Sequence, residues 1–369
     1  MTTPGRPPDG VLLLGAPLSL SGRYARQGMQ AAAGLQQAVQ DAQVRGGVRL
    51  GDRLLVPDVL IVDDGGTQAG VVAALEVVAG AHVLVGPYGS DLAAAAGRWA
   101  QQRGRVLFNH GGSADEVQRL PGVVSVCSRA TGYFPPVLEL VAAARPAARV
   151  LLAVGPGGFG RAVAAGVADT VGRLGMELVG TVAHDEVSEA AAGDILLIAG
   201  RFEDDTGLVH RLRSARSGTM VAAVGAGLHA FGRELGRRAE GVLAPSQWDE
   251  GVHFHPDVGP RQAAVIQALR ARVLPKLSAV SGGGHVDYPA AQAYAAAVIA
   301  LHCVQLAGRL DDRALAQAAR DLHCTTFFGR FGLGDDGRQD DHEVLVVQWQ
   351  RGVKRVVGPA ALAEAPLVI

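Results

Sequence analysis

The chain has 369 residues, 49% of them hydrophobic and 19% charged, so it is long enough to bury a sizeable core in one large domain or in two. Its 34 basic and 35 acidic residues give a formal net charge of -1. Such a balance produces no long-range field that would hold a nucleic-acid backbone or an anionic membrane surface. The composition predicts a globular protein that does not bind nucleic acid.

The cysteines carry no metal-binding or redox motif. Cys127, Cys303 and Cys324 are widely spaced and include no CxxC pair. This pattern favours buried free thiols over zinc binding or thiol chemistry. A disulfide between Cys303 and Cys324 stays open as an alternative.

The N-terminal sequence MTTPGRPPDG has no apolar stretch before Val11. We therefore expect no export signal in the chain as given, and a flexible tail over residues 1–10. No apolar run reaches the roughly 18 residues that a membrane span requires, so we expect no membrane insertion. The location stays open between the cytoplasm and an exported protein whose signal has been removed.

Strand-length apolar runs alternate with helical patterns through the first half of the chain. Turns fall where Gly, Ser, Asp or Asn permits them, and this alternation is typical of βαβ units with a parallel sheet. The predicted elements are strands at 11–15, 56–63, 83–86 and 106–109, and helices at 24–43, 68–79 and 92–102.

A second series of the same kind follows and predicts a second open sheet. Its elements are strands at 149–154, 177–182, 194–199 and 220–223, and helices at 161–174, 205–214 and 228–235. A long Ala-rich helix begins at DYPAAQAYAAAV, and the C-terminal region is predicted to form a β-hairpin with EVLVVQW as a strand and a turn at 335–337. The fold class is α/β.

Six segments occur in the order and spacing of a known family: PLSLSGRYARQG, IVDDGGTQAGVVAA, VLVGPYGSDLAAAA, VLFNHGGSADEV, YPAAQAYAAAV and GRFGLGDDGRQ. Over nearly its whole length the chain resembles type I periplasmic binding proteins of the branched-chain amino acid and amide class. The resemblance implies two Rossmann-like lobes with parallel central sheets, joined by three crossover segments near Ser128, Trp248 and Thr326. The N-terminal lobe would contain residues 11–127 and 252–325, and the C-terminal lobe residues 128–251 and 326–369.

Two loops at strand ends of the first lobe are candidates for ligand binding. Ligands of open α/β sheets bind beyond the carboxyl ends of the strands, where glycines permit close approach and helix N-termini offer free N–H groups. The segments GPYGSD and NHGGS lie at such ends, and the alternative role of their serines is helix capping. The resemblance implies that these loops hold a carboxylate or amide, with the candidate residues Gln27, Tyr88, Ser90, His110, Gly111 and Ser113.

The second lobe would enclose the ligand with aromatic side chains. The resemblance implies that Phe159 in GPGGFG and Phe202 in AGRFEDD form these walls, with Tyr133 added from the first crossing. Tyr88 and these three residues are predicted to lie in loops. Trp248 is expected either to line the hinge or to pack there.

One position departs from the family pattern. Where the branched-chain amino acid binders carry a glutamate for the ligand's ammonium, this chain has Ala226. Either Glu203, Asp204 or Asp205 replaces that glutamate, or the ligand has no α-amino group. The aromatic lid is also altered, since Gln27 stands where an aromatic residue is frequent.

The resemblance implies a protein that is not an enzyme. It would capture a small polar solute, such as an amino acid derivative, an amide or a carboxylic acid, as the binding component of an ABC transporter, with a permease as partner and no cofactor. The alternative is a cytoplasmic ligand sensor of the same fold that acts on a regulatory protein.

A remote alternative is an NAD-dependent enzyme, since Gly155, Gly157 and Gly160 satisfy GxGxxG between a strand and a helix. The fingerprint also needs an acid about 20 residues further on, at the end of the next strand. The first candidates, Asp185 and Glu186, lie beyond that spacing, so the match is poor.

No segment matches a GxSxG, HExxH or P-loop motif, so we predict no catalytic residue. His253 and His255 are expected to be surface histidines and not metal ligands. Asp63 and Asp64 are expected to cap the following helix and to solvate the rim of the ligand crevice.

Overall fold

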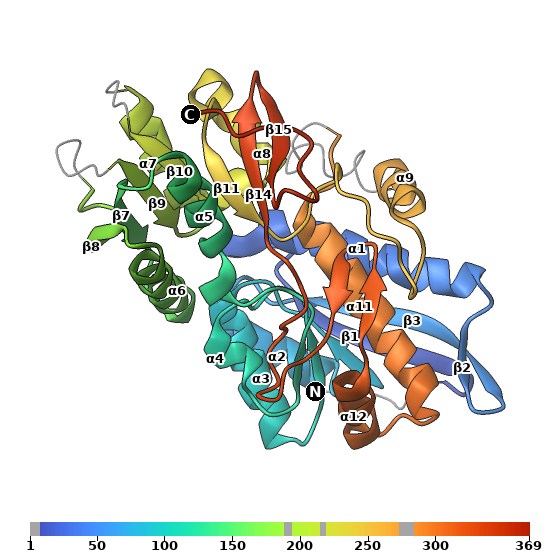
Figure 1. Ribbon diagram of the computed structural model, residues 1–369. Coiled ribbons are helices and arrows are strands. Elements are labelled where there is room, and N and C mark those ends of the chain that lie inside the picture. Colours follow the sequence, from blue (N-terminus) through green and yellow to red (C-terminus); the bar gives the residue numbers. More distant parts are fainter. Residues whose placement is uncertain (1–7, 188–193, 215–218, 273–283) are drawn as a thin grey trace. The chain divides into compact units, whose positions relative to one another are not determined.

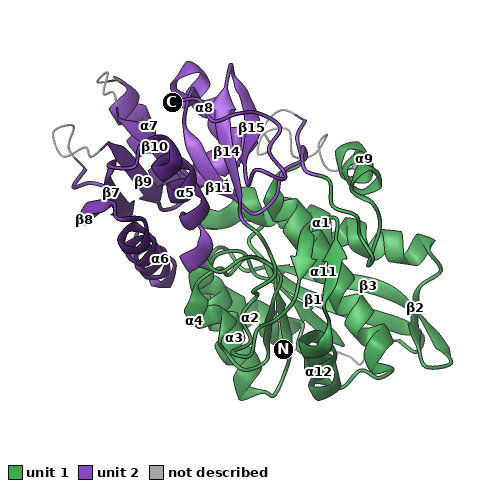
Figure 2. Ribbon diagram, viewed as in Figure 1, with its two compact units in different colours: residues 1–129, 253–277, 286–343 green, residues 130–252, 278–285, 344–369 purple. Residues whose placement is uncertain are grey.

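The computed structural model describes residues 8–187, 194–214, 219–272 and 284–369. The chain forms two compact units (Figure 2). Unit 1 contains residues 1–129, 253–277 and 286–343, and unit 2 contains residues 130–252, 278–285 and 344–369. Residues 1–7 of the predicted N-terminal tail lie outside the described residues.

Unit 1 is built on a six-stranded sheet in the order β2-β3-β1-β4-β5-β6. All neighbouring strands are parallel except β2 and β3, which are antiparallel. Strands β4, β5 and β6 are short and entirely buried, and most of β1 is buried, as expected of a sheet covered on both faces, whereas β3 is longer and mostly exposed or half-buried. The strands are β1 (Val11–Leu18), β2 (Val48–Leu50), β3 (Arg53–Asp63), β4 (Val83–Val85), β5 (Leu107–Asn109) and β6 (Val123–Ser125).

The helices of unit 1 follow its strands in sequence. The core lies where apolar side chains of α2 and α3 meet β4 and β5, among them Leu75, Trp99 and Leu107. The helices are α1 (Ala25–Val44), α2 (Gln68–Val77), α3 (Ser90–Gln102), α4 (Asp115–Gln118), α9 (Gln262–Arg272), α11 (Tyr288–Ala307) and α12 (Asp312–Asp321), with a 3-10 turn at Gly22–Tyr24. A small hairpin of β12 (Cys324–Thr326) and β13 (Gly329–Phe331) completes the unit.

Helix α11 is the predicted Ala-rich helix, and it packs against α1 (Figure 1). The two backbones approach so closely that a side chain at Gly34 of α1 would lie 2.0 Å from the carbonyl oxygen of Ala290. Over its 20 residues α11 is long and apolar enough to cross a membrane, which corrects the expectation that no segment would pass that test. Because 78% of its most apolar stretch is buried in the protein, these properties match a core helix.

Unit 2 contains a seven-stranded sheet in the order β15-β14-β11-β10-β9-β7-β8. The strands from β11 to β8 are parallel, and β14 and β15 add an antiparallel edge. The strands are β7 (Arg149–Val154), β8 (Glu177–Ala183), β9 (Ile195–Ala199), β10 (Met220–Ala223), β11 (Leu243–Ser246), β14 (Leu345–Gln350) and β15 (Val353–Gly358). Together the two units confirm the predicted α/β class.

The helices of unit 2 bury one apolar face each. Val137 of α5 and Val163 and Val167 of α6 pack in one core with Leu152 and Leu197 of the sheet, and each such buried side chain contributes about 1.5–3 kcal/mol. The helices are α5 (Pro135–Ala144), α6 (Gly158–Leu174), α7 (Phe202–Ser214) and α8 (His229–Leu235), with 3-10 turns at Ala130–Gly132, Val224–Gly227 and Gly236–Ala239.

The C-terminal hairpin differs from the prediction. The alternating run is the strand β14, and its hairpin turn is formed by Arg351 and Gly352, with φ of 54° and 76°. Two consecutive residues of positive φ match the twist of a tight hairpin. Residues 335–337 do form the predicted turn, which is closed by an antiparallel bridge between Leu333 and Gln339, but this turn does not join β14 to its partner strand. The sequence also gave no sign of the short strands β2 and β6, which contain three residues each.

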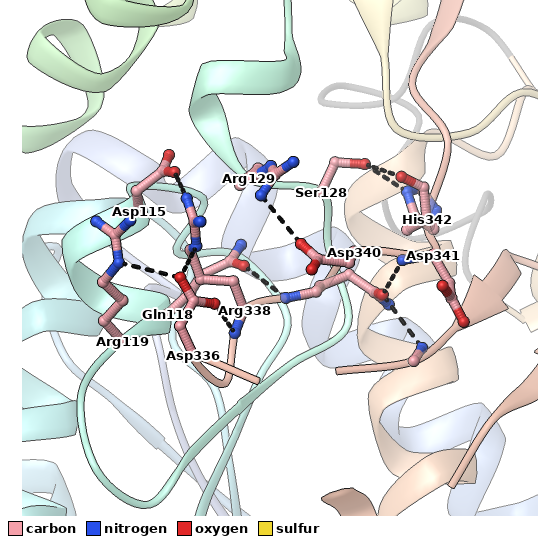
Figure 3. Close-up of polar contacts among 12 residues, drawn as sticks. Asp115, Gln118, Arg119, Ser128, Arg129, Asp336, Arg338, Asp340, Asp341 and His342 are labelled. Atoms are coloured by element: carbon pink, nitrogen blue, oxygen red, sulfur yellow. Dashed lines mark hydrogen bonds and ion pairs between the residues drawn. The ribbon is translucent and has the colours of Figure 1, made fainter. Parts of the chain in front are cut away.

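The segment between β13 and β14 packs on unit 1, as Figure 3 shows. Arg338 donates to Asp115 at 2.7 Å, and the Ser128 hydroxyl lies 2.6 Å from Nδ1 of His342. These contacts keep residues up to 343 in unit 1, whereas the chain was expected to cross near Thr326. The first two expected crossings, by contrast, lie near the unit boundaries at 129/130 and 252/253.

All three cysteines are buried and free. The expectation of free thiols is confirmed, and Cys303 and Cys324 do not form the alternative disulfide. Burial raises the pKa of each thiol to about 12, so none is a thiolate near neutral pH.

Candidate functional site

The loops after β4 and β5 lie together at the carboxyl edge of the unit 1 sheet. Tyr88 and Gly111 form a parallel bridge, and the amide of Gly89 donates to the carbonyl of Gly111 at 3.1 Å. The hydroxyl of Ser90, the first residue of α3, accepts from the amide of Ala114 at 3.0 Å. The structure thus brings together the two loops that the sequence singled out.

Glycine is required at two positions of these loops. Gly89 has a φ of 98°, which other residues rarely adopt. A Cβ at Gly111 would lie 2.7 Å from the Cα of Tyr88. Only residues without a side chain allow the two loops to approach so closely.

Asn109 organises the second loop, a role that sequence reasoning missed. The side chain is fully buried; its Nδ2 donates to the carbonyl of Gly112 and to the hydroxyl of Ser125, both at 2.8 Å. Its Oδ1 accepts from the amide of Gly112 at 2.8 Å. Because asparagine forms such turns with the backbone two or three residues on, the NHGG segment is the signal that could have revealed it.

His110 is completely buried beside this turn. Neither ring nitrogen has a hydrogen-bond partner among the described residues. Burial lowers its pKa to about 3, so the ring is neutral near pH 7 and has one donor and one acceptor. An unpaired buried polar group costs about 1–3 kcal/mol, so His110 has a capacity for hydrogen bonding that the described residues of unit 1 do not use.

Of the other candidates of unit 1, Ser113 and Gln27 are buried and Tyr88 is partly exposed. Ser113 is 6% exposed, and its hydroxyl lies 3.9 Å from the sulfur of Cys127. Gln27 is 5% exposed in α1. Tyr88 is partly exposed, and its hydroxyl lies 3.2 Å from that of Tyr288.

Asp63 and Asp64 build a loop and do not cap the next helix as expected. Asp63 accepts from the amides of Leu20 and Ser21 and from the Ser21 hydroxyl. Burial is the largest single influence on its pKa and raises it, but the hydrogen bonds together outweigh burial and hold the pKa below its ordinary value. Burial raises the pKa of Asp64, which accepts from Ser19 at 2.6 Å. The cap of α2 is Thr67, because its hydroxyl accepts from the amide of Gly70.

Each aromatic candidate of unit 2 other than Trp248 lies in the first turn of a helix or just before one. Phe159 and Phe202 lie in the first turns of α6 and α7, whereas loops were expected. Tyr133, just before α5, packs edge-on against Phe159 with 5.3 Å between ring centroids. Phe202 and Tyr133 are buried, at 4% and 6% exposed, and Phe159 is half-buried.

Ala226 and Trp248 are fully buried. Ala226 lies in the turn that follows β10, and its carbonyl accepts from Nε1 of Trp349 at 2.9 Å. The Cβ of Ala226 provides no charge for an ammonium group. Trp248 follows β11, close to the boundary of the unit.

Asp205 was named as one possible replacement for the missing glutamate, but its carboxylate is engaged inside unit 2. It is fully buried, accepts from the amide of Gly225 at 2.8 Å, and lies 3.2 Å from Nε2 of His184. Sequence reasoning gave His184 no role in the ligand site. Glu203 and Asp204 of the same helix are exposed.

The residues considered for metal or dinucleotide binding are exposed or make a local hydrogen bond. His253 and His255 are both exposed, and no group of three or more metal-ligating side chains occurs among the described residues. Glu186, considered as the acid of a dinucleotide fingerprint, accepts a hydrogen bond from the amide of Ala183 at 2.8 Å.

The chain matches one known protein family over most of its length. The model of a family described as periplasmic binding protein matches residues 13–354. A search of curated proteins finds no match. Among solved structures, the branched-chain amino acid transporter substrate binding protein LivJ from Streptococcus pneumoniae, in complex with isoleucine, is similar with a TM-score of 0.77 at 16% identity, covering 95% of this chain and 100% of that one.

Two further structures are similar over nearly their whole lengths. A leucine binding protein LivK from Thermotoga maritima has a TM-score of 0.76 at 15% identity, covering 94% of this chain and 98% of that one. An ABC transporter solute binding protein from R. palustris, in complex with benzoate, has a TM-score of 0.74 at 19% identity, covering 96% and 98%. At these identities the likeness establishes the fold alone.

Proposed function

Because the chain belongs to the periplasmic binding protein family, whose model matches residues 13–354, we propose that it is the solute-binding component of an ABC transporter and is not an enzyme. It captures a small polar solute without altering it and delivers it to a permease. The family implies a periplasmic or extracellular location.

The observation that carries this proposal is the pair of joined loops in unit 1. Tyr88 and Gly111 link the loops through their backbones, and Ser90 links them through its hydroxyl. His110, buried beside them, has two ring nitrogens without a partner among the described residues. A carboxylate or amide bound here would receive hydrogen bonds from the hydroxyls of Ser90 and Ser113 and one from the N–H of His110. The amide of Gly111, which donates to Oδ1 of Asn109 at 3.3 Å, would be shared between Asn109 and the ligand.

Unit 2 carries aromatic candidates that are suited to apolar contacts with a ligand. Tyr133 and Phe159 form an edge-on aromatic pair, and Phe202 begins the next helix after β9. Aromatic side chains bury large areas and favour a flat or branched apolar group. With Ala226 in place of a charged residue, the ligands that fit are carboxylic acids, amides and amino acid derivatives whose ammonium needs no buried carboxylate at that position.

The N-terminus of a single helix cannot supply the binding free energy that a solute-binding protein needs. An exposed helix N-terminus contributes about 0.3–1 kcal/mol to anion binding, whereas a micromolar dissociation constant corresponds to about 8 kcal/mol. The remainder must come from hydrogen bonds that are shielded from water and from apolar burial. Gln27 and Tyr88 are assigned to the ligand, and Trp248 to the hinge or rim of the site.

A thermal-shift screen tests the proposal. The purified protein is heated with isoleucine, benzoate, a set of aliphatic and aromatic amides, sugars and NAD. A ligand at 100 times its Kd stabilises the native state by about 2.7 kcal/mol, so at least one acid or amide is expected to raise the melting temperature by several degrees. Stabilisation by NAD would contradict the proposal. So would a screen in which no acid, amide or amino acid raises the melting temperature.

A further inference from the structure

One buried carboxylate joins several strand ends of unit 2. Asp205 of α7 accepts from the amide of Gly225, after β10, at 2.8 Å. It also accepts from the amide of Gly200, after β9, and bonds with His184, after β8. The side chain is fully buried, so these contacts are shielded from water.

His184 extends the connection to a fourth strand. Its ring bonds through Nε2 with Asp205 at 3.2 Å and hydrogen-bonds with the backbone of Val154, the last residue of β7. The Nη2 of Arg211 on α7 donates to the His184 carbonyl at 3.2 Å. The side chain of His184 is 15% exposed. The pair therefore contacts the carboxyl ends of β7, β8, β9 and β10.

His184 and Asp205 pack so closely against Gly200 that a side chain at this position has no room. A Cβ there would lie 2.5 Å from Nε2 of His184 and 2.9 Å from Oδ1 of Asp205. At Gly225 it would lie 3.1 Å from the Cβ of Asp205. These two glycines begin the segments that carry Phe202 and Ala226, so the pair fixes the backbone of the candidate ligand-binding segments.

We propose that His184 and Asp205 are positioning residues for ligand binding, and that the protonated form of His184 strengthens binding by holding the strand-end loops of unit 2. This inference rests on the proposed function, because the loops concerned are those assigned to the ligand. It concerns the support of the site and not a direct contact with the ligand.

The direction of the effect follows from the number of donors. A protonated imidazole has two N–H groups and can donate to Asp205 and to the Val154 carbonyl together, whereas a neutral ring has only one N–H. Burial opposes protonation of His184, but the hydrogen bond with Asp205 and the charges of Asp205 and Asp204 outweigh it and raise its pKa above the ordinary 6.5. Among the described residues, the charged groups that act on His184 include Asp205 and Asp204 at the ring and the guanidinium of Arg211 at the backbone carbonyl, and all three lie on α7. Both contacts are therefore present at pH 6, and one is lost as pH rises through the raised pKa.

The test measures affinity against pH with two variants. Isothermal titration calorimetry with benzoate and with isoleucine is run from pH 6.0 to 8.5 on the wild type, on His184→Gln and on His323→Gln. His323 makes a similar contact with Asp341, at 3.0 Å, but both side chains are exposed and lie in unit 1, so its variant is a matched control. The wild type and the control are expected to bind about tenfold more weakly at pH 8.5 than at pH 6.0.

In His184→Gln the affinity is expected to be low and independent of pH, since glutamine keeps a donor but is not protonated. An unchanged pH profile in His184→Gln, or a flat profile in the wild type, would overturn the inference and leave the proposed function standing.

Hydrogen exchange of the free protein gives a readout that needs no ligand. At pH 6.0 the peptide that contains Gly225 is expected to exchange about tenfold faster in His184→Gln than in the wild type, because its amide donates to Asp205. Equal exchange in the two proteins would overturn the inference. If neither probe binds but the exchange differs, the positioning role is supported and the choice of ligand class fails.

Discussion

The two units hold their strand-end loops by different means. In unit 1 the loops after β4 and β5 are held by neutral groups: the Asn109 side chain and the backbone bridge between Tyr88 and Gly111, with the buried neutral ring of His110 beside them. Unit 2 uses a buried ionisable pair, His184 and Asp205. Hydrogen bonds between neutral groups persist as pH changes, until the pH is low enough to protonate a buried group. An ionisable pair that contains a histidine changes its charge within the physiological pH range. One fold, used twice, thus supports its loops in two chemically distinct ways.

The largest expected effect is an opposite response of the two units to pH. Burial lowers the pKa of His110 to about 3 and that of His342 to about 4. Groups with lowered folded pKa lose stability as pH falls below the ordinary 6.5, so at pH 5 each of these histidines costs unit 1 about 2 kcal/mol. His184 has a raised pKa, so its contribution to unit 2 is complete below pH 6.5 and is lost as pH rises through that raised value.

Hydrogen exchange measured peptide by peptide at pH 5 and pH 8 distinguishes the pH response of unit 1 from that of unit 2. Peptides of the unit 1 sheet are expected to lose about 4 kcal/mol of protection at pH 5, after correction for intrinsic exchange, while peptides of β7 to β10 are not. His110→Leu removes the titration of a ring that has no hydrogen-bond partner among the described residues, and should recover about half of that loss. Equal acid sensitivity in the two units would contradict the comparison.

The next effect is steric and breaks the unit 1 arrangement directly. In Gly111→Val the new Cβ lies 2.7 Å from the Cα of Tyr88, so the bridge between the loops has to open. We expect a loss of about 3 kcal/mol in the free energy of unfolding, measured with urea, and no measurable ligand binding. Gly172→Val on α6 is the control, because a Cβ there meets nothing within 4 Å; it should cost about 0.5 kcal/mol or less after allowing for helix propensity. Similar losses in both variants would argue against the close approach.

The smallest effects concern the two serines. Ser113→Ala and Ser90→Ala are each expected to weaken ligand binding about tenfold, which is the loss of one hydrogen bond of about 1.4 kcal/mol. Ser90→Ala also removes the acceptor for the Ala114 amide and should lower stability by about 1 kcal/mol, whereas Ser113→Ala should leave it nearly unchanged. If both variants lose stability and keep full affinity, the serines are structural and not ligand contacts.

Much of the fold could be predicted because periodicity and turn residues are local. The strands Val11–Leu18 and Arg149–Val154 and the helix Ala25–Val44 were all predicted within a few residues. The short strands β2 and β6 were not, since three residues carry too little pattern to detect. The attachment of residues 327–343 to unit 1 depends on Arg338 and His342 meeting residues more than 200 positions away, which no local pattern encodes.

The residues of the candidate site likewise divide into those that could be predicted from the sequence and those that could not. Ser90 and Gly111 could be found because glycine-rich loops after strands are visible in the sequence, and the structure brings them together. His184 and Asp205 could not, because their contact joins the end of one strand to a helix 21 positions later. Nothing in the spacing of a single histidine and one of three adjacent acids indicates that they meet.

Native mass spectrometry of the protein as purified, and after addition of each acid and amide from the screen, tests most directly whether this chain captures a solute. The account predicts one bound molecule per chain, with the mass of a small carboxylic acid, amide or amino acid, and loss of that adduct in the Ser90→Ala, Ser113→Ala double variant. A bound dinucleotide, chemical conversion of the added compound, or an adduct that the double variant keeps at full occupancy would contradict it.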